Sequence, residues 1–296
     1  MNKTIVGGVD IGGSHITVGL VDLNKGTLID LSLRREMVNS NDGVENVIKT
    51  WTAVILESFK SVNALPSRIA ISMPGPFDYD KGVCLIKDQN KYDALFGLNV
   101  KELLSKSLSI GVEDIVLIND ALCFLQGEIF GGAAKGLVNV IGLTLGTGLG
   151  SSRYRNGEVE DANLWCSSFK NGIAEDYIST RWFLKRYHEL TKKNVPGVKE
   201  IAQVISADKY SKQVFNEFGK NLAEFLLPQV IEQKPQLVVL GGNISQALPH
   251  FISAFDKRVK ESNIDIKIKK AQFGENAALM GAASFIQIPL ELHRTA

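Results

Sequence analysis

The chain has 296 residues, of which 45% are hydrophobic and 22% charged, a composition typical of a globular protein long enough for two domains. Lysine and arginine (33) almost balance aspartate and glutamate (32), without runs of like charge, so we expect neither nucleic acid nor a membrane as a partner. Three separated cysteines, four scattered histidines and the lack of a signal-peptide pattern favour a cytoplasmic protein that binds a small molecule.

The first half of the sequence alternates predicted strands and helices. Three β-rich runs predict an antiparallel meander at residues 4–11, 15–22 and 26–36. Apolar residues at helical spacing then predict a helix over 44–59, with Asn41 or Asp42 as its N-cap. Buried strands are predicted at 68–73 and 114–120, and a helix at 121–132 follows the second of them.

The second half begins with the same pattern as the first. Residues 139–157 predict a strand, a glycine turn and a second strand, so the two halves look related. Helical spacing dominates from about residue 174 to 231. A strand that ends in two glycines and a helix of small residues are predicted at 235–245 and 275–286.

Two glycine-rich turns join consecutive strands, Gly12-Gly13-Ser14 and Gly146-Thr147-Gly148. A dinucleotide-binding turn would precede a helix, and a P-loop would end in Gly-Lys-Ser/Thr, so neither motif fits. A hairpin tip without side chains lets a phosphate approach the backbone N–H groups. Ordinary hairpin glycines explain either turn alone, whereas the pair favours phosphate binding.

Asp10 lies just before the first turn, where its charge would repel a phosphate. Proteins hold Mg²⁺ through carboxylates, water and substrate phosphates. The acid therefore predicts a complex of a nucleotide with Mg²⁺, which Asp10 holds through water.

Six segments, in order along most of the chain, resemble bacterial sugar kinases of the ROK family (repressor, open reading frame, kinase), within the actin-like ATPase superfamily. They read VDIGGSHITVGLVD, SMPGPFD, INDALCFLQGE, LTLGTGLG, VVLGGNIS and NAALMGAASF. The resemblance implies an α/β, two-lobed actin-like ATPase (ribonuclease H-like) fold. Each lobe is then a mixed β-sheet flanked by helices, with a cleft between the lobes for ATP and a sugar. The resemblance also implies a homodimer.

On this resemblance, residues 1–118 form the small N-terminal lobe and 119–296 the large C-terminal lobe, and a helix at about 276–290 packs back on the first. The first phosphate loop comprises Asp10, Gly12, Gly13 and Ser14, and the second comprises Gly146, Thr147 and Gly148. Gly241 and Gly242 resemble the adenosine-side glycines, and a plain strand-to-helix turn is the alternative.

Asp120 ends an apolar strand, where open α/β sheets display ligand-binding groups. A kinase that acts on a hydroxyl needs an acceptor for the proton. The family's catalytic aspartate follows an asparagine in the same way, so the resemblance implies Asp120 as the base and Asn119 as a partner of the sugar hydroxyls. The alternative is that this pair only caps the next helix.

The sugar-binding region departs from the family pattern. Members typically carry a His-x-Gly-His-like segment and a cysteine-rich zinc element, whereas residues 157–180 contain one cysteine and no histidine. No structural zinc is therefore expected. Alignment of GIAEDYIS with the end of that element implies Glu175 as a sugar-binding carboxylate, and a solvated acid in a first helical turn is the alternative. Asn163, Asn90 and, after Asn90, Tyr92 are further sugar-binding candidates, although a polar surface loop also explains Asn90 and Tyr92.

The sequence thus predicts a glucokinase-like enzyme that transfers the γ-phosphoryl of ATP, with Mg²⁺, to a hydroxyl of a hexose or hexose derivative. One alternative is a ROK-type transcriptional regulator without its DNA-binding domain, since the sequence begins at a strand and not at a helix-turn-helix. Another is a catalytically weak sugar-binding regulatory protein. The intact Asn119-Asp120 pair argues against the latter.

Overall fold

The computed structural model describes residues 4–286. Its contacts divide the chain into two compact units. The first comprises the chain up to Gly132 together with the segment from Glu275 onwards, and the second comprises Ala133–Gly274. None of the helices within residues 4–286 is both long and apolar enough to cross a bilayer.

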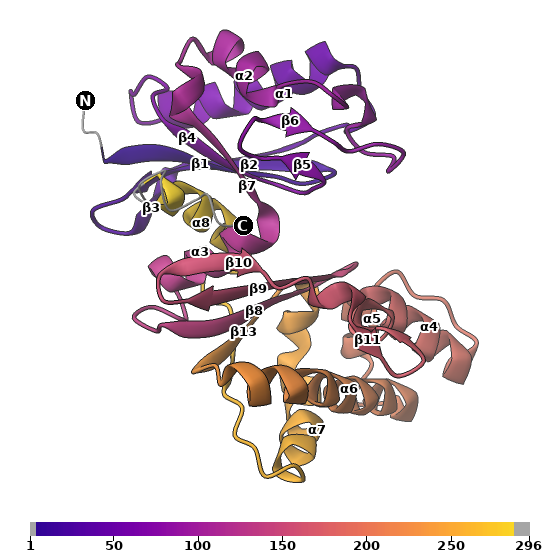
Figure 1. The fold of residues 1–296 in the computed structure, drawn as a ribbon. Helices are drawn as coiled ribbons and strands as arrows, with labels where there is room; N and C mark the ends of the chain where they lie inside the picture. Colours follow the sequence, from indigo (N-terminus) through magenta and orange to yellow (C-terminus); the bar gives the residue numbers. More distant parts are fainter. Residues whose placement is uncertain (1–3, 287–296) are drawn as a thin grey trace. The chain divides into compact units, whose positions relative to one another are not determined.

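The first unit is built around a five-stranded sheet with the order β3-β2-β1-β4-β7 (Figure 1). Its strands are β1 (Ile5–Ile11), β2 (His15–Asp22), β3 (Thr27–Met37), β4 (Ile69–Met73) and β7 (Ile115–Asn119). The first three pair antiparallel, which confirms the predicted meander, and β4 pairs parallel with both β1 and β7. Parallel strands end at one edge of a sheet, so Asp10 pairs with Ser72, and Met73 with Asn119, at that edge.

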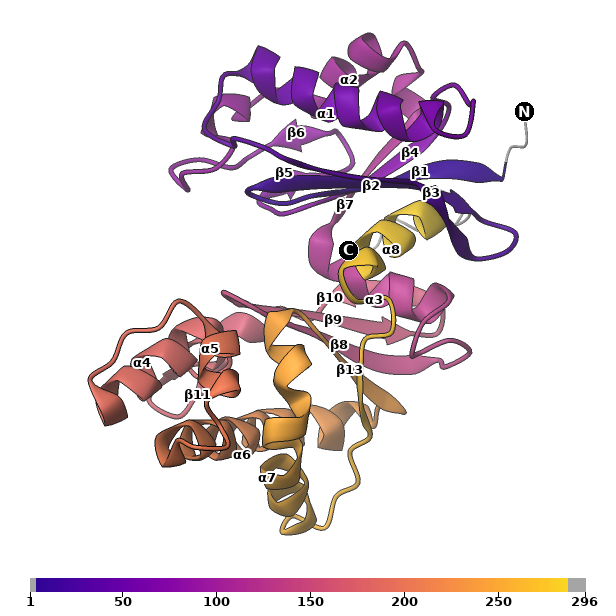
Figure 2. The ribbon, with the colours of Figure 1, turned by 180° about the vertical axis from the view of Figure 1, so that it is seen from behind.

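Helices cover both faces of this sheet, with α1 and α2 on one face and α3 and α8 on the other (Figures 1 and 2). The helices are α1 (Val44–Lys60), α2 (Val100–Leu108), α3 (Asp120–Phe130) and α8 (Ala277–Phe285). Short elements are β5 (Phe77–Asp78), β6 (Val83–Cys84) and the 3₁₀ turns η1 (Asp93–Leu95), η2 (Val112–Asp114) and η6 (Gly274–Asn276).

The close packing of α3 on α8 depends on glycine. A Cβ at Gly281 would lie 1.8 Å from the carbonyl oxygen of Cys123, so only glycine allows this approach. Because this contact holds α3 in the first unit, that unit ends after Gly132, later than the boundary expected after residue 118. Residues 287–290 of the helix expected at 276–290 lie outside the described residues.

The start of α1 corrects one prediction. The helix begins at Val44 with Gly43 in the N-cap position, so neither Asn41 nor Asp42 caps it. Asn39 Nδ2 instead donates to Asp42 Oδ1 at 2.6 Å, which uses these polar side chains in the turn before the helix.

The second unit repeats the topology of the first. Its sheet has the order β10-β9-β8-β13-β14. The strands are β8 (Asn139–Leu145), β9 (Leu149–Arg155), β10 (Glu158–Asp161), β13 (Leu237–Gly241) and β14 (Ile268–Lys270). Again three strands pair antiparallel, and the fourth strand in the order, β13, pairs parallel with both neighbours. The repeated order confirms the expectation of one mixed sheet in each half.

Helices α6 and α7 pack on one face of the second sheet (Figure 2). The helices are α4 (Thr180–Thr191), α5 (Val198–Gln203), α6 (Lys209–Gln233) and α7 (Leu248–Lys260). Short elements are the hairpin strands β11 (Ser168–Phe169) and β12 (Gly172–Ile173) and the 3₁₀ turns η3 (Leu164–Cys166), η4 (Ala174–Asp176) and η5 (Asn243–Ala247). Phe183, Phe215 and Phe218 form an aromatic core between α4 and α6, with ring centres 4.6 to 5.0 Å apart around Phe183.

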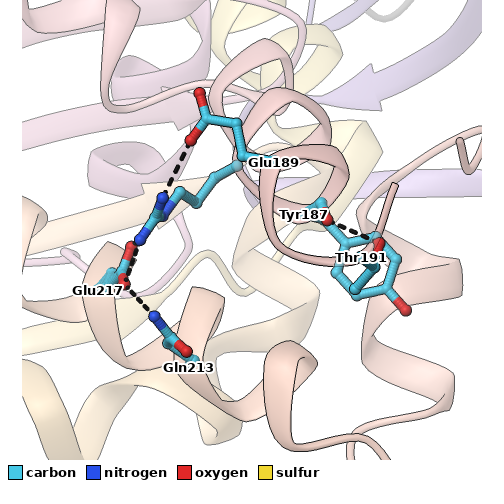
Figure 3. Close-up of polar contacts among 6 residues, drawn as sticks. Tyr187, Glu189, Thr191, Gln213 and Glu217 are labelled. Atoms are coloured by element: carbon cyan, nitrogen blue, oxygen red, sulfur yellow. Dashed lines mark hydrogen bonds and ion pairs between the residues drawn. The ribbon is translucent and has the colours of Figure 1, made fainter. Parts of the chain in front are cut away.

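Ion pairs also fix α4 on α6. Arg186 donates from Nε and Nη2 to Glu217 at 2.6 and 3.0 Å, and from Nη1 to Glu189 at 3.0 Å. Figure 3 shows that Gln213 reaches the same Glu217 carboxylate, at 2.8 Å. The two carboxylates raise the pKa of Arg186 through these hydrogen bonds. Together these contacts hold α4 in place, and η4 lies directly before it.

Candidate active site

The first glycine turn, Gly12-Gly13-Ser14, joins β1 to β2. The Gly12 N–H donates to the carbonyl oxygen of His15 at 2.9 Å, and the Val38 N–H donates to that of Ser14 at 2.8 Å. Gly13 and Ser14 are exposed, and a Cβ on Gly13 would meet no atom within 4 Å. The turn therefore presents accessible backbone, which a phosphate needs for close approach.

Asp10 is partly buried at the end of β1. Ser72 Oγ, on the adjacent strand β4, donates to Asp10 Oδ1 at 2.8 Å. Burial raises the pKa of Asp10 to about 6, the Ser72 hydrogen bond opposes this effect, and the negative charge of Asp120 raises the pKa further. The two carboxylates thus interact electrostatically at one edge of the sheet.

Asn119 and Asp120 join β7 to α3. Asn119 Oδ1 accepts the Ala121 N–H at 2.9 Å as the N-cap of α3, and Asn119 Nδ2 donates to the Tyr79 hydroxyl at 3.2 Å. Asp120 Oδ1 also accepts the Ala121 N–H at 2.9 Å, and the residue is exposed. The pair therefore does cap the helix, and this role is compatible with a second one, because Asp120 remains exposed beside Asp10.

Mg²⁺ fits the chemistry of this edge. Among residues 4–286, three or more His, Cys, Asp or Glu side chains do not gather anywhere in a way that could hold a metal ion. Mg²⁺ is commonly bound through only one or two carboxylates, with water and substrate phosphates as its other ligands. Asp10, with Asp120 nearby, would offer carboxylate oxygens of the kind that could hold such an ion.

The second glycine turn, Gly146-Thr147-Gly148, joins β8 to β9. The Gly146 N–H donates to the Gly148 carbonyl oxygen at 3.0 Å, and the Thr180 N–H donates to that of Gly146 at 2.8 Å. Gly241 ends the neighbouring parallel strand β13. Gly242 has φ +78°, and a Cβ there would lie 2.4 Å from the Leu145 carbonyl oxygen. The structure thus brings the candidate adenosine-side glycines next to the second turn and requires glycine at 242.

Glu175, in η4, contacts the second turn directly. The Leu149 N–H donates to Glu175 Oε2 at 2.9 Å, and a Cβ on Gly148 would lie 2.4 Å from the same oxygen. Arg181, in the first turn of α4, donates to Glu175 Oε1. The Glu175 side chain is only 20% exposed, so it is not a freely solvated acid. Its carboxylate instead connects the second turn with the start of α4.

The β11–β12 hairpin lies in the region where the sequence departs from the family pattern. Lys170, at its tip, has φ +53°. Its Nζ donates to Asn221 Oδ1 and lies 3.4 Å from Glu224 Oε2, both on α6. The same Nζ lies 5.4 Å from the ring centre of Phe169 and 5.6 Å from that of Tyr177. One lysine thus ties the hairpin to α6, directly before η4.

The two candidate asparagines lie in different units. Asn163 is exposed, with φ +47°, and precedes η3, which packs against η4. Asn90 is exposed in the loop before η1, with φ +55°. Tyr92, two residues later, is fully buried, so its ring is not available to stack on a sugar. The structure therefore places Asn163 close to the Glu175 segment and Asn90 in the first unit.

Sequence reasoning missed Ser72 and Arg181, which contact candidate site residues, and Lys170, which holds the neighbouring hairpin. Ser72 directly precedes the segment MPGP at the end of a buried strand, and this position at the ligand-binding edge was the available signal. Lys170 lies within residues 157–180, where the family's cysteine-rich zinc element is missing, and Arg181 follows this stretch directly. Their charges look solvated in the sequence, and only the fold shows their partners.

The chain is similar to known proteins over most of its length. The model of the ROK family matches residues 6–161 and 157–288. The glucokinase of Thermotoga maritima is 25% identical over 97% of this chain and 98% of that protein. The N-acetyl-D-glucosamine kinase of Pectobacterium carotovorum is 24% identical over 93% and 97%. A ROK family glucokinase from Streptomyces griseus, solved with glucose and AMPPNP, superposes with a TM-score of 0.74 at 21% identity over 95% of this chain and 98% of that one, which shows the same fold.

Proposed function

The chain belongs to the ROK family, and on this basis we propose that it is an ATP-dependent sugar kinase. A hydroxyl oxygen of a hexose or hexose derivative attacks the γ-phosphorus, the bond from that phosphorus to the β,γ-bridging oxygen breaks, and ADP leaves. The names of the Thermotoga and Pectobacterium relatives support glucose and N-acetylglucosamine as the first substrates to test. The glucose and AMPPNP in the Streptomyces structure support a sugar and a nucleotide as ligands.

In this proposal Asp120 accepts the proton of the attacking hydroxyl. Phosphoryl transfer depends mainly on positioning and on stabilisation of charge. Asn119 and Glu175 therefore orient sugar hydroxyls, while the backbone N–H groups of the glycine turns bind phosphate oxygens. Mg²⁺, when bound, neutralises phosphate charge, and Asp10 would hold it through water.

One observation supports this function above the others. Asp10, Asn119 and Asp120 converge at one sheet edge beside the first glycine turn, and burial together with Asp120 raises the pKa of Asp10. Perturbed carboxyl pKa values of this kind are common at catalytic sites. A protein that only bound sugar would need neither the second acid nor an adjacent phosphate loop.

The experiment that tests this function is an ADP-release assay with MgATP and a panel of hexoses, amino sugars and N-acetylated sugars. We expect turnover with at least one sugar and only slow ADP release without sugar, because excluding water protects the phosphoryl group. If calorimetry shows that a sugar binds but the assay detects no ADP release, the result would contradict the kinase function. It would support the alternative of a sugar-binding regulatory protein.

Lys170 gives a prediction for the β11–β12 hairpin, which precedes the proposed sugar-binding residue Glu175. Lys170→Met keeps most of the aliphatic stem but removes the charge that contacts Asn221 and Glu224. Charge-assisted hydrogen bonds and cation–π contacts of this kind contribute about 1–3 kcal/mol. We expect a lower melting temperature and a sugar KM raised roughly 3- to 10-fold, because η4 loses its support, while the KM for MgATP changes less.

Lys209→Met is the matched control, since Lys209 Nζ also lies over an aromatic ring, 5.0 Å from the centre of Tyr210. Lys209 is exposed at the start of α6. We expect this variant to keep the wild-type sugar KM. An unchanged sugar KM in Lys170→Met would show that the hairpin does not position the sugar site.

A further inference from the structure

Tyr92 is fixed by the core of the first unit. Its side chain is fully buried, and its ring meets that of Trp51 edge-on at 5.3 Å. The Tyr92 N–H donates to the Ser40 carbonyl oxygen at 2.7 Å. Its φ of +55° is uncommon for a residue with a bulky side chain and persists only where the surroundings determine it. The position of the hydroxyl is therefore set by packing.

That hydroxyl contacts the first glycine turn. Tyr92 Oη donates to the carbonyl oxygen of Gly12 at 2.6 Å, between residues 80 positions apart in the sequence. Burial raises the pKa of the Tyr92 hydroxyl, so it remains a hydrogen-bond donor across the physiological pH range. The contact is distinct from the hairpin's own hydrogen bond, in which the Gly12 N–H donates to His15.

The hydrogen bond determines which way one peptide group faces. In a trans peptide the C=O of one residue and the N–H of the next point in opposite directions. With the Gly12 carbonyl held toward the buried Tyr92, the Gly13 N–H must point the other way. Glycine on both sides makes this peptide unusually free to rotate, and a Cβ on Gly13 would meet no atom within 4 Å. The turn alone therefore cannot fix the direction of this N–H.

We propose that Tyr92 is a positioning residue that holds the Gly12–Gly13 peptide with the Gly13 N–H directed outward, ready to bind a phosphate oxygen of the nucleotide. The proposal rests on the proposed kinase function, because it assigns a phosphate to this turn. It deepens that function by naming the side chain that prepares the turn before the nucleotide binds. Without the hydroxyl, binding must also select one peptide orientation from two, which weakens affinity.

Tyr92→Phe tests the proposal, since it keeps the ring that packs on Trp51 and removes only the hydroxyl. One hydrogen bond of this kind corresponds to roughly a 3- to 10-fold change in an equilibrium constant. We expect the Kd for MgADP, measured by calorimetry, and the KM for MgATP to rise by that factor. The sugar KM should stay within about twofold of wild type.

A second measurement does not depend on nucleotide. In ligand-free protein labelled with ¹⁵N-glycine, we expect the Gly13 amide of Tyr92→Phe to show exchange broadening from peptide rotation, which the wild type lacks. Tyr187→Phe is the matched control, because Tyr187 Oη donates to Asp208 Oδ2 at 2.9 Å in the second unit, at the N-cap of α6. It loses one tyrosine hydrogen bond as well, and its nucleotide constants should match those of wild type.

The outcomes separate the two proposals. If the wild type turns over sugar and Tyr92→Phe has wild-type nucleotide constants and an unbroadened Gly13 signal, the role of Tyr92 is wrong and the kinase function stands. If both tyrosine variants lose nucleotide affinity equally, the effect is one of general stability, which also overturns the role of Tyr92. If the wild type does not bind MgADP and forms no ADP from MgATP with any sugar, the kinase function is wrong, and the role of Tyr92 is wrong with it.

Discussion

Asp120→Asn is expected to lower turnover roughly 10²- to 10⁴-fold while MgADP binding stays within about twofold of wild type. Asparagine has the same shape but cannot accept the proton of the sugar hydroxyl at neutral pH. Helix α3 should still form, because Asn119 remains its N-cap. Steady-state kinetics with the best sugar of the panel, together with calorimetry for MgADP, measure both effects.

Asp30→Asn is the control for this variant. Asp30 is exposed on β3 and is also an acid of the first unit, but it lies away from the edge where Asp10 and Asn119 end their strands. The control should turn over as fast as the wild type. Near-normal turnover in Asp120→Asn would remove Asp120 as the base and leave the glycine turns as the main support for a nucleotide-binding protein.

Asp10→Asn is expected to weaken MgADP binding roughly 10- to 100-fold at pH 7.5 and to remove a pH dependence that the wild type shows. The pKa of Asp10 is about 6 in the ligand-free protein, so the carboxyl is mostly neutral below pH 6 and mostly ionised above it. Mg²⁺ binds the ionised form. The affinity of the wild type for MgADP should therefore rise about tenfold between pH 5 and pH 7. In the variant, the asparagine at position 10 does not titrate, so this rise should be absent.

Stability should change in the opposite direction. The folded-state pKa of Asp10 lies above its ordinary value of 3.8, so the folded protein binds more protons than the unfolded chain between these values. The contribution of this group to stability is therefore largest at low pH and is lost as the pH rises through about 6. At pH 7.5, without ligand, Asp10→Asn should melt higher than the wild type, as expected where function requires a buried charge. A lower melting temperature of Asp10→Asn together with unchanged MgADP affinity would contradict both the expected gain in stability and the role of Asp10 in binding Mg²⁺.

The strands of the first sheet were predictable because each of them carries a local signal. Alternation and a glycine turn mark the meander, and apolar runs mark the buried strands β4 and β7. Helix α2 was not predicted, since it is only nine residues long and its apolar face is limited to three buried residues. Its cap, Asn99, accepts the Glu102 N–H at 3.2 Å, a signal that is too common to stand out in sequence.

The candidate site was predictable only in part, because some of its residues lie in local motifs and others are joined only by the fold. Asp10 and Asp120 stand out in the sequence as candidates because one lies near the end of a predicted strand and the other at the junction of a strand and a helix, next to recognisable motifs. The hydrogen bonds from Tyr92 to Gly12 and from Leu149 to Glu175 join residues far apart in the chain, so no local pattern reveals them. Tyr92 is a sugar-binding candidate by its place in a polar loop, yet its side chain is fully buried and packs on Trp51.

The packing of α8 against α3 has a consequence for biosynthesis. The first unit contains the early part of the chain and also a helix that follows the whole of the second unit. During translation, the ribosome makes the second unit before it makes α8. Until α8 is made, the face of α3 that packs on α8 stays uncovered, including the surface at Cys123 that Gly281 later contacts. Domains usually fold in the order of their synthesis. Here the middle of the polypeptide can complete its fold before the part that emerged first.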